Sequence, residues 1–490
     1  MRLTLGALAL LAVLAACSAS EEGELGDGEA EKIPISTVSS EARSLYLEGR
    51  SLQENLRGTE AHGYFVRALA KDPKFALAHL GAAQSSPTGN AFFSHLEQAV
   101  ELAALASDGE RHQILAFAAG VNRDPVAAKE HAETLLQAFP QDERAHAAIA
   151  AFYFGRQEYG PAAEHYHRAT EINPEFPQPY NQLGYAQRFL GDYAAAEAAF
   201  RKYIDLVPAE PNPYDSYAEL LMKVGRFEES IENYRRALEA DQHFVASHIG
   251  IALNEILLGE ASAARRTCDG FYESARNDGE RRQALTWRAR SFLFEGDNEA
   301  ALAEIQRRYD IAAKSSDASS MANDLTLMGR ILLEAGRADA AESRFAEGVA
   351  MMESSDATEE VKAATRRNYL YAQARIALLG GDLVAAQSTA DEYGAQVRWH
   401  RVPTEVWLHH ELEGLLALEA GDFALAVIGL EQASQMDPRI LYLRALAHLG
   451  KGERAQAKEL CSQAANWNGL HPNYAFVRAP ARHLLEELER

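Results

Sequence analysis

The fold is decided by residues 177–210, which read PQPYNQLGYAQRFLGDYAAAEAAFRKYIDLVPAE. Pro177 and Pro179 fall in the first turn of a predicted helix, where a missing N–H group leaves no hydrogen bond unmade. Gly191 supplies the left-handed residue that ends this helix, and Pro208 stops a second helix. The stretch therefore predicts two helices joined by a tight turn at Gly191.

The same pattern recurs along the chain with a period of 34 residues, as the spacing of Gly191, Gly225 and Gly259 shows. Residues 109–278 hold five copies without insertion or deletion, which begin at 109, 143, 177, 211 and 245. The copy near 76–106 is shorter, and those near 282, 322 and 367 are expected to have longer connections. A period of this length predicts a solenoid, in which each repeat packs on its neighbours.

These repeats closely resemble the tetratricopeptide repeat, in which a Leu-Gly pair in the first helix precedes an alanine, an aromatic residue and a closing proline. In residues 177–210 these positions hold Leu183, Gly184, Ala196, Phe200 and Pro208. The resemblance implies an all-α fold, a right-handed α-solenoid of about twelve helix-turn-helix repeats. Regular repeats are expected at 41–278, repeats with longer connections at 279–400, and C-terminal repeats with a polar capping helix at 401–490.

Several positions have packing roles in this frame. Ala196 is expected where the two helices touch, and Glu197, one step further, is expected to point outward. Cys268 and Cys461 occupy the position that holds Phe200, so we interpret them as buried thiols that act as small hydrophobic residues. The alternative, a redox or metal pair, would have to join two distant repeats.

One position of the first helix carries a column of rings: His79, His112, His146 and His248, together with Tyr180 and Tyr214. Metal binding is the alternative to packing here. Neighbouring helix axes are about 8–10 Å apart, which is long for two imidazoles that share one ion. We therefore interpret the column as packing rings with a buried polar edge, and we expect neither a metal nor a cofactor.

Charge and missing motifs exclude several function classes. The chain has 48 Lys and Arg residues against 71 Asp and Glu residues, a net charge of −23 that repels phosphate backbones. Nucleic acid is therefore not an expected partner. The sequence has no phosphate loop, no Gly-x-Ser-x-Gly elbow and no Rossmann glycine fingerprint. The chain is accordingly not expected to be an enzyme.

The N-terminus resembles that of a bacterial lipoprotein. Leu3 to Val13 is an apolar run too short to span a bilayer, and Leu14-Ala15-Ala16-Cys17 resembles a lipobox. The resemblance implies that residues 1–16 are a signal peptide and that Cys17 carries the lipid, palmitate included, with the outer membrane favoured because Ser18 follows. The alternative is an ordinary signal peptide cut near Ala16. Residues 17–40 are rich in acidic residues, which predicts a lipidated, flexible tether.

A candidate partner surface comes from positions 2, 5, 9 and 12 of each first helix, which share one face because steps of three and four residues return to the same side. In the tetratricopeptide family this face lines a concave groove that takes peptide segments. The expected groove residues are Gln178, Asn181, Tyr185, Arg188, Asn212, Asp215, Glu219 and Met222. Tyr185 and Glu219 hold equivalent positions and are expected side by side. The residues that clamp a C-terminal carboxylate in some members of this family are missing from 181–250.

Together these features predict an envelope-anchored, non-enzymatic scaffold or adaptor that binds protein or peptide partners in its groove. The alternative function is a surface lipoprotein that captures a glycan or nutrient. Against this alternative, the chain has only four tryptophans and its repeats lack large insertions.

Overall fold

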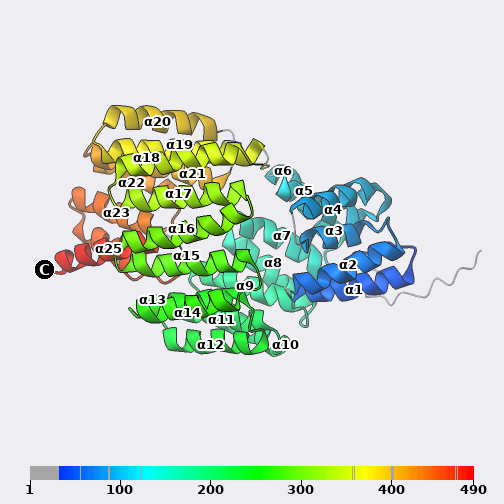
Figure 1. The fold of residues 1–490 in the computed structure, drawn as a ribbon. Helices are drawn as coiled ribbons and strands as arrows, with labels where there is room; N and C mark the ends of the chain where they lie inside the picture. Colours follow the sequence, from blue (N-terminus) through cyan, green and yellow to red (C-terminus); the bar gives the residue numbers. More distant parts are fainter. Residues whose placement is uncertain are drawn as a thin grey trace, which may run out of the picture. The chain divides into compact units, whose positions relative to one another are not determined.

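The computed structural model describes residues 32–55, 57–86, 89–122, 124–355, 357, 359–398, 402–469, 471 and 473–490. The predicted signal peptide, Cys17 and the expected tether up to residue 31 lie outside these described residues. Within them the structure holds helices and no strand, which confirms the all-α prediction (Figure 1). No described helix combines the length and the apolar character that crossing a membrane requires. The chain divides into two compact units, residues 1–186 and 187–490.

The first unit consists of helix pairs from four repeats and most of the first helix of a fifth. Its helices are α1 (Ser40–Glu54), α2 (Gly58–Lys71), α3 (Ala76–Gln84), α4 (Gly89–Leu102), η1 (Ala103–Leu105), α5 (Asp108–Val121), α6 (Pro125–Ala138), α7 (Glu143–Gly155) and α8 (Tyr159–Ile172). The division between the units falls inside α9 (Pro177–Leu190). Within each unit the odd-numbered helices pack on the even-numbered helices that follow them, as α1 does on α2 and α7 on α8. We call the odd-numbered helices up to α23 A helices and the even-numbered ones B helices.

The second unit continues the same alternation. Its helices are α10 (Tyr193–Leu206), α11 (Pro211–Lys223), α12 (Phe227–Ala240), α13 (Val245–Leu257), α14 (Ala261–Ser274), α15 (Asp278–Phe294), α16 (Asn298–Lys314), α17 (Ala318–Glu334), α18 (Ala338–Glu353), α19 (Glu359–Leu379), α20 (Leu383–Val397), α21 (Pro403–Glu419), α22 (Phe423–Gln432), α23 (Pro438–Gly450), α24 (Arg454–Ala465) and α25 (Tyr474–Glu489). The described helices therefore run in chain order as twelve A–B pairs followed by α25, as the repeats predict.

The turn between A and B helices needs a left-handed residue, as predicted at Gly191. Eight glycines fill this place in unit 2 with φ between +74° and +85°: Gly191, Gly225, Gly259, Gly296, Gly336, Gly381, Gly421 and Gly452. In the turn after α7 the residue is Gln157, with φ of +62°. Because side chains other than glycine rarely adopt this conformation, Gln157 marks the one strained turn of this type among the described residues.

The sequence predicts longer connections at 279–400, and the structure places most of the added residues in the helices instead. Helices α11 to α14 have 13 or 14 residues each, whereas α15, α16 and α17 have 17 each and α19 has 21. The extra residues therefore lengthen the helices, while the turns that join α15, α16, α17 and α18 stay short. The repeat period grows because each pair gains helical turns, which enlarges the apolar face that it can bury.

Packing inside the repeats follows the predicted frame. Ala196, Phe200 and Cys461 are fully buried, and Cys268 is 3% exposed. Both cysteines are free thiols, as the packing interpretation requires. Glu197 does not simply point outward, because its carboxylate accepts hydrogen bonds from Tyr217 Oη at 2.7 Å and from Arg226 at 3.3 Å. It thereby joins its own repeat to the next one.

Enlarging Ala196 should destabilise the second unit. Ala196→Leu adds three carbons at a fully buried position, so we expect the free energy of unfolding to fall by about 1–3 kcal/mol. Ala198→Leu makes the same change on the exposed side of α10 and is expected to cost less than about 0.5 kcal/mol. Urea unfolding followed by circular dichroism measures both variants. Equal losses would show that the repeat frame is misassigned.

Candidate binding surfaces

The eight predicted groove residues differ in how much of them solvent can reach. Asn181, Asp215 and Met222 are buried, with exposures of 4%, 4% and 1%. The other five, Gln178, Tyr185, Arg188, Asn212 and Glu219, keep partial exposure. Three of the eight predicted groove residues are therefore buried within the chain, and binding of a partner by the eight stays a prediction. The expected neighbourhood of Tyr185 and Glu219 spans the division between the two units and stays a prediction.

Several of these polar side chains bind one another. Arg188 Nη1 lies 2.9 Å from Glu219 Oε2, and Tyr203 Oη donates to Asn212 Oδ1 at 3.1 Å. Ser247 Oγ donates to Asp215 Oδ1 at 2.7 Å, so Asp215 links α11 to α13. The stripe thus fastens successive repeats together as well as facing solvent.

Asp215 is not the free carboxylate that the sequence suggested. Burial, followed by repulsion from Glu219, raises its pKa to about 8. The folded state therefore holds a proton that the unfolded chain loses near pH 4. The contribution of Asp215 to stability consequently decreases as the pH rises from about 4 to 8.

Met222 is buried because a distant part of the same chain lies on it. Trp467 and the first turn of α25, residues 474–478, form what we call the covering segment. Trp467 and Tyr474 share one apolar cluster with Met222, Leu253 and Trp287. The side chain of Lys223 lies over the Trp467 ring, with Nζ 4.2 Å from its centroid. The C-terminus of the chain therefore covers A helices that precede it by more than 200 residues.

Further contacts extend this cover along the A helices. The Tyr474 and Phe294 rings lie 5.2 Å apart, and Arg478 Nη2 donates to the Leu257 carbonyl at 3.2 Å. Phe476 packs against the cluster that contains Leu293 and Met328. Helices α15 and α25 lie beside each other in Figure 1. The predicted polar capping helix thus also packs, through its first turn, on the A-helix face that was expected to meet a partner.

Three arginines that were not among the expected groove residues line the same face. Arg290, Arg330 and Arg375 each precede a turn glycine, at 296, 336 and 381, by six residues. This is the repeat position of Tyr185 and Glu219. The signal was present in the sequence, but it becomes visible only when each repeat is aligned on its own turn glycine, because the helices between these glycines differ in length.

In the first unit, the residues just before α1 are bound along the starts of A helices. Ile33 N–H donates to Asp142 Oδ2 and Ser36 N–H to Glu110 Oε1, both at 2.7 Å. Thr37 Oγ1 donates to Asp72 Oδ2 at 2.6 Å, and Lys32 Nζ lies 2.5 Å from Glu143 Oε2. The flexible tether expected up to residue 40 therefore ends earlier, because the carboxylates at these helix ends hold an extended backbone in place.

The histidine column forms pairs between A and B helices of the first unit. The Nδ1 atoms are 3.2 Å apart in His79–His95, and 3.1 Å apart in His112–His131 and His146–His165. His79 and His146 use Nε2 to donate to the carbonyls of the prolines six residues earlier, at 3.1 and 3.2 Å. Each Nδ1 of these two residues is therefore an acceptor, and each pair holds one proton between its rings.

The column has the structural role predicted for it. Tyr214 Oη donates to the Pro208 carbonyl at 3.0 Å, and His248 Nε2 donates to the Gln242 carbonyl at 2.9 Å, the same six-residue connection in unit 2. His79 and His146 are buried, as a packing ring with a polar edge should be. The described residues contain no group of three or more His, Cys, Asp or Glu side chains arranged to hold a metal ion.

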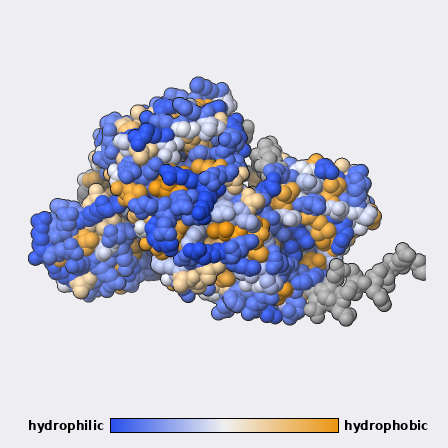
Figure 2. Space-filling view, turned by 90° about the horizontal axis from the view of Figure 1, so that it is seen from below, coloured by the Kyte–Doolittle hydropathy of each residue, from blue (hydrophilic) through white to orange (hydrophobic). Residues whose placement is uncertain are grey.

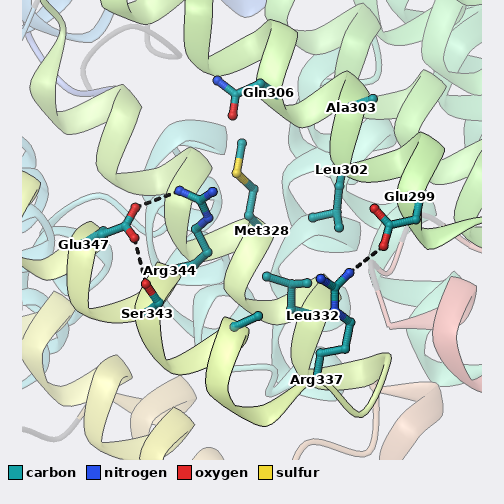
Figure 3. A pocket seen from close by; sticks show the side chains of 11 residues that line it. Glu299, Leu302, Ala303, Gln306, Met328, Leu332, Arg337, Ser343, Arg344 and Glu347 are labelled. Atoms are coloured by element: carbon teal, nitrogen blue, oxygen red, sulfur yellow. Dashed lines mark hydrogen bonds and ion pairs between the residues drawn. The ribbon is translucent and has the colours of Figure 1, made fainter.

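A pocket of about 490 Å³ opens between α16, α17 and α18 (Figure 3). Leu302, Met328 and Leu332 form its apolar part. Its charges bind one another, since Arg344 pairs with Glu347 at 2.7 Å and Arg337 with Glu299 at 2.5 Å. No unbalanced charge in this pocket would select a charged ligand. Figure 2 shows one face of the molecule as mostly hydrophilic, with separate hydrophobic patches.

Comparisons with known proteins agree with this architecture. A model of the tetratricopeptide repeat family matches residues 177–210 and 212–244. A small glutamine-rich tetratricopeptide repeat-containing protein 2 from Mycosarcoma maydis is 25% identical over 108 residues, which are 22% of this chain and 31% of that protein. The human DnaJ homolog subfamily C member 7 is 29% identical over 107 residues, 22% of this chain and 21% of that protein. The chain thus spans less than a third of the length of these relatives.

Among solved structures, a tetratricopeptide repeat protein from Parabacteroides merdae is similar over 54% of this chain and 99% of its own, with 16% identity and a TM-score of 0.38. A MamA protein is similar over 33% of this chain and 87% of its own, with 17% identity and a TM-score of 0.29. The two matched family segments coincide with the pairs α9–α10 and α11–α12, and the same pair with the same turn recurs on both sides of them. The chain therefore contains tetratricopeptide repeats at residues 177–210 and 212–244, within a longer series of similar helix pairs.

Proposed function

We propose that this protein is a non-enzymatic scaffold, anchored to the bacterial envelope by a lipid on Cys17, that binds protein partners along its A helices. Tetratricopeptide repeats are protein-interaction scaffolds, and the repeat fold is typically without enzymatic activity. The lipobox-like residues 14–17 and the acidic residues that follow them support the anchored arrangement. The outer membrane is the proposed location.

One observation carries the proposal of partner binding: the bound extended segment at residues 32–37. Its backbone N–H groups donate to Asp142 and Glu110, and these contacts do not depend on the identity of the side chains that they hold. A segment from another protein would offer the same groups. Carboxylates at the starts of A helices are therefore suited to holding an extended polypeptide.

Photo-crosslinking tests partner binding. We would place benzoylphenylalanine at Tyr185, a partly exposed A-helix position, and at Tyr193, which is 40% exposed on B helix α10. Both changes replace tyrosine by a larger aromatic residue, so they are matched. In cells that produce the protein, we expect one defined protein to crosslink at position 185 and not at 193. Equal labelling at both positions, or none at 185, would contradict the proposal, and binding on a glycan array without any protein adduct would favour glycan capture.

The anchor is tested separately, with Cys17→Ser. We expect this variant to lose radiolabelled fatty acid and to leave the membrane fraction, because the thioether lipid needs the sulfur atom of Cys17. Stable retention takes more than one acyl chain, so loss of the lipid should release the protein completely. A wild-type protein that carries no label would exclude lipid anchoring while leaving partner binding intact.

A further inference from the structure

Two arginines on the A-helix face of unit 2 lack a directly paired carboxylate. Arg290 on α15 and Arg330 on α17 form no hydrogen bond and no ion pair with any residue that the structure describes. The Arg290 guanidinium lies 4.0 Å from the centroid of the Trp287 ring, and that of Arg330 lies 5.8 Å from the centroid of Phe476 in the covering segment. Both side chains keep part of their surface accessible to solvent.

Four other arginines of this region form ion pairs, which distinguishes them from Arg290 and Arg330. Arg375 holds the same repeat position on α19, and its Nη2 atom lies 2.7 Å from Glu334 Oε1. Arg439 pairs with the same carboxylate at 2.5 Å and lies 3.1 Å from Glu411. On the other side, Arg282 and Arg308 share Asp324 at 2.8 and 3.1 Å. The carboxylates of this region are therefore already used by other arginines.

The charge of this face is consequently positive in a protein that is strongly acidic overall. Six arginines at positions 282, 290, 308, 330, 375 and 439 share this region with four carboxyl groups, the paired Asp324, Glu334 and Glu411 and also Asp437, which interacts with Arg439 and Arg330. His471 adds no positive charge to this face, because burial and the nearby Arg330 and Arg290 lower its pKa to about 4 and keep it neutral. Burial, and after it repulsion from Arg330 and Arg308, lowers the pKa of Arg290 to about 10.

A partly enclosed guanidinium without a partner is unfavourable unless a ligand completes it. We propose that Arg290 and Arg330 bind an oxyanion, a carboxylate or phosphate group, between α15, α17 and the covering segment. Guanidinium groups suit this ligand because their planar N–H donors match two oxygens of a carboxylate or phosphate. This inference rests on the proposed scaffold function and deepens it, since it names the chemical group that a partner or ligand presents to unit 2.

The proposed site differs from the pocket between α16, α17 and α18, because its two arginines are not paired with carboxylates. Arg337 and Arg344 also line a cavity, but each is paired there with a glutamate (Figure 3). Removing these two arginines changes the net charge of the protein as much as removing Arg290 and Arg330 does. Arg337 and Arg344 are therefore a matched control pair, which separates binding at one site from a general effect of charge.

The test is calorimetric titration of the full chain at pH 7 and low ionic strength, with inorganic phosphate and with the peptide triglutamate as probes and sodium chloride as the control for ionic strength. We expect at least one probe to bind the wild-type protein saturably. The variant with Arg290→Gln and Arg330→Gln should bind it at least tenfold more weakly, since each change removes a charge-assisted bidentate contact. The variant with Arg337→Gln and Arg344→Gln should bind as the wild type does.

The two probes identify the source of the oxyanion, because binding of phosphate alone indicates a phosphate ligand and binding of triglutamate alone indicates acidic side chains. Arg290→Lys with Arg330→Lys keeps the charge but loses the planar fork, and we expect intermediate affinity. Circular dichroism confirms that each variant is folded. The proposed site is wrong if the wild type binds neither probe. It is also wrong if the variant at positions 290 and 330 and the variant at positions 337 and 344 lose affinity equally. Crosslinking at Tyr185 would be unaffected by that result, so failure here and failure of the scaffold function are distinguishable.

Discussion

Tyr474→Ala is expected to lower the free energy of unfolding of unit 2 by about 3–5 kcal/mol, the cost of removing a large buried aromatic side chain. Tyr474 is 1% exposed and lies in the cluster of Met222 and Trp287, with its ring 5.2 Å from that of Phe294. Loss of the ring leaves a cavity under the covering segment. We therefore expect hydrogen exchange to accelerate in α11, α13 and α15 as the segment detaches.

Tyr474→Phe is the matched control for this prediction. Tyr474 Oη is buried and has no hydrogen-bond partner among the described residues, so removing it should leave stability unchanged or slightly raised. Tyr193→Ala removes a tyrosine that is 40% exposed and should cost less than about 1 kcal/mol. Urea unfolding measures all three variants. If Tyr474→Phe destabilises as much as Tyr474→Ala, the hydroxyl group and not the packing of the ring fixes the segment.

The histidine pairs of unit 1 should make that unit sensitive to acid. The pKa values of His79, His95, His112, His146 and His165 are lowered, chiefly by burial. The unfolded chain takes up protons near the ordinary histidine pKa of 6.5, whereas the folded pairs take them up only at lower pH. Stability is therefore complete above pH 6.5 and falls as the pH decreases towards the folded pKa values.

Between pH 7 and pH 5 we expect the free energy of unfolding of unit 1 to fall, because the unfolded chain takes up protons that the paired histidines of the folded state do not. The variant with His112→Tyr and His146→Tyr should lose less stability over this pH range than the wild type, since only one pair remains. Tyr214 donates to a carbonyl six residues earlier in the same way as His146, so the fold has room for tyrosine at this position. Urea unfolding at the two pH values, with hydrogen exchange of α3 to α8, provides the measurement.

His167→Tyr is the control for this acid sensitivity. His167 is exposed in α8 of the same unit and takes no part in the pairs. Its replacement should leave the dependence of stability on pH as it is in the wild type. If the double variant shows the same loss between pH 7 and pH 5 as the wild type, groups other than the paired histidines control the acid sensitivity.

Much of the fold could be predicted because each repeat is encoded by residues close together in sequence. Gly191 requires a left-handed turn, Ala196 and Phe200 fill the helix contact, and Pro208 ends the pair, all within 34 residues. The helix lengths between 279 and 400 could not be predicted in this way. A longer period does not show whether the extra residues join the helices or the turns, since both keep the apolar residues on one face.

The binding surface was less predictable, because it depends on what lies opposite each residue. Asp215, Glu219 and Met222 share one helix face, which the sequence determines through steps of three and four residues. The sequence does not show that Ser247 binds Asp215, or that Trp467 and Tyr474 cover Met222. In the sequence, a polar residue looks the same whether its hydrogen bonds are made with water or with another part of the chain.

By itself, the sequence determined the helix pairs, the turn glycines and the small and aromatic residues packed between them, because neighbouring repeats touch through positions that recur with the period. Only the tertiary structure decided which A-helix positions are covered and which charges are left unpaired. The covering segment meets residues such as Leu257, more than 200 positions earlier, because small rotations between successive repeats of unit 2 add up along the chain. That sum is a property of many repeats together, and no single repeat contains it.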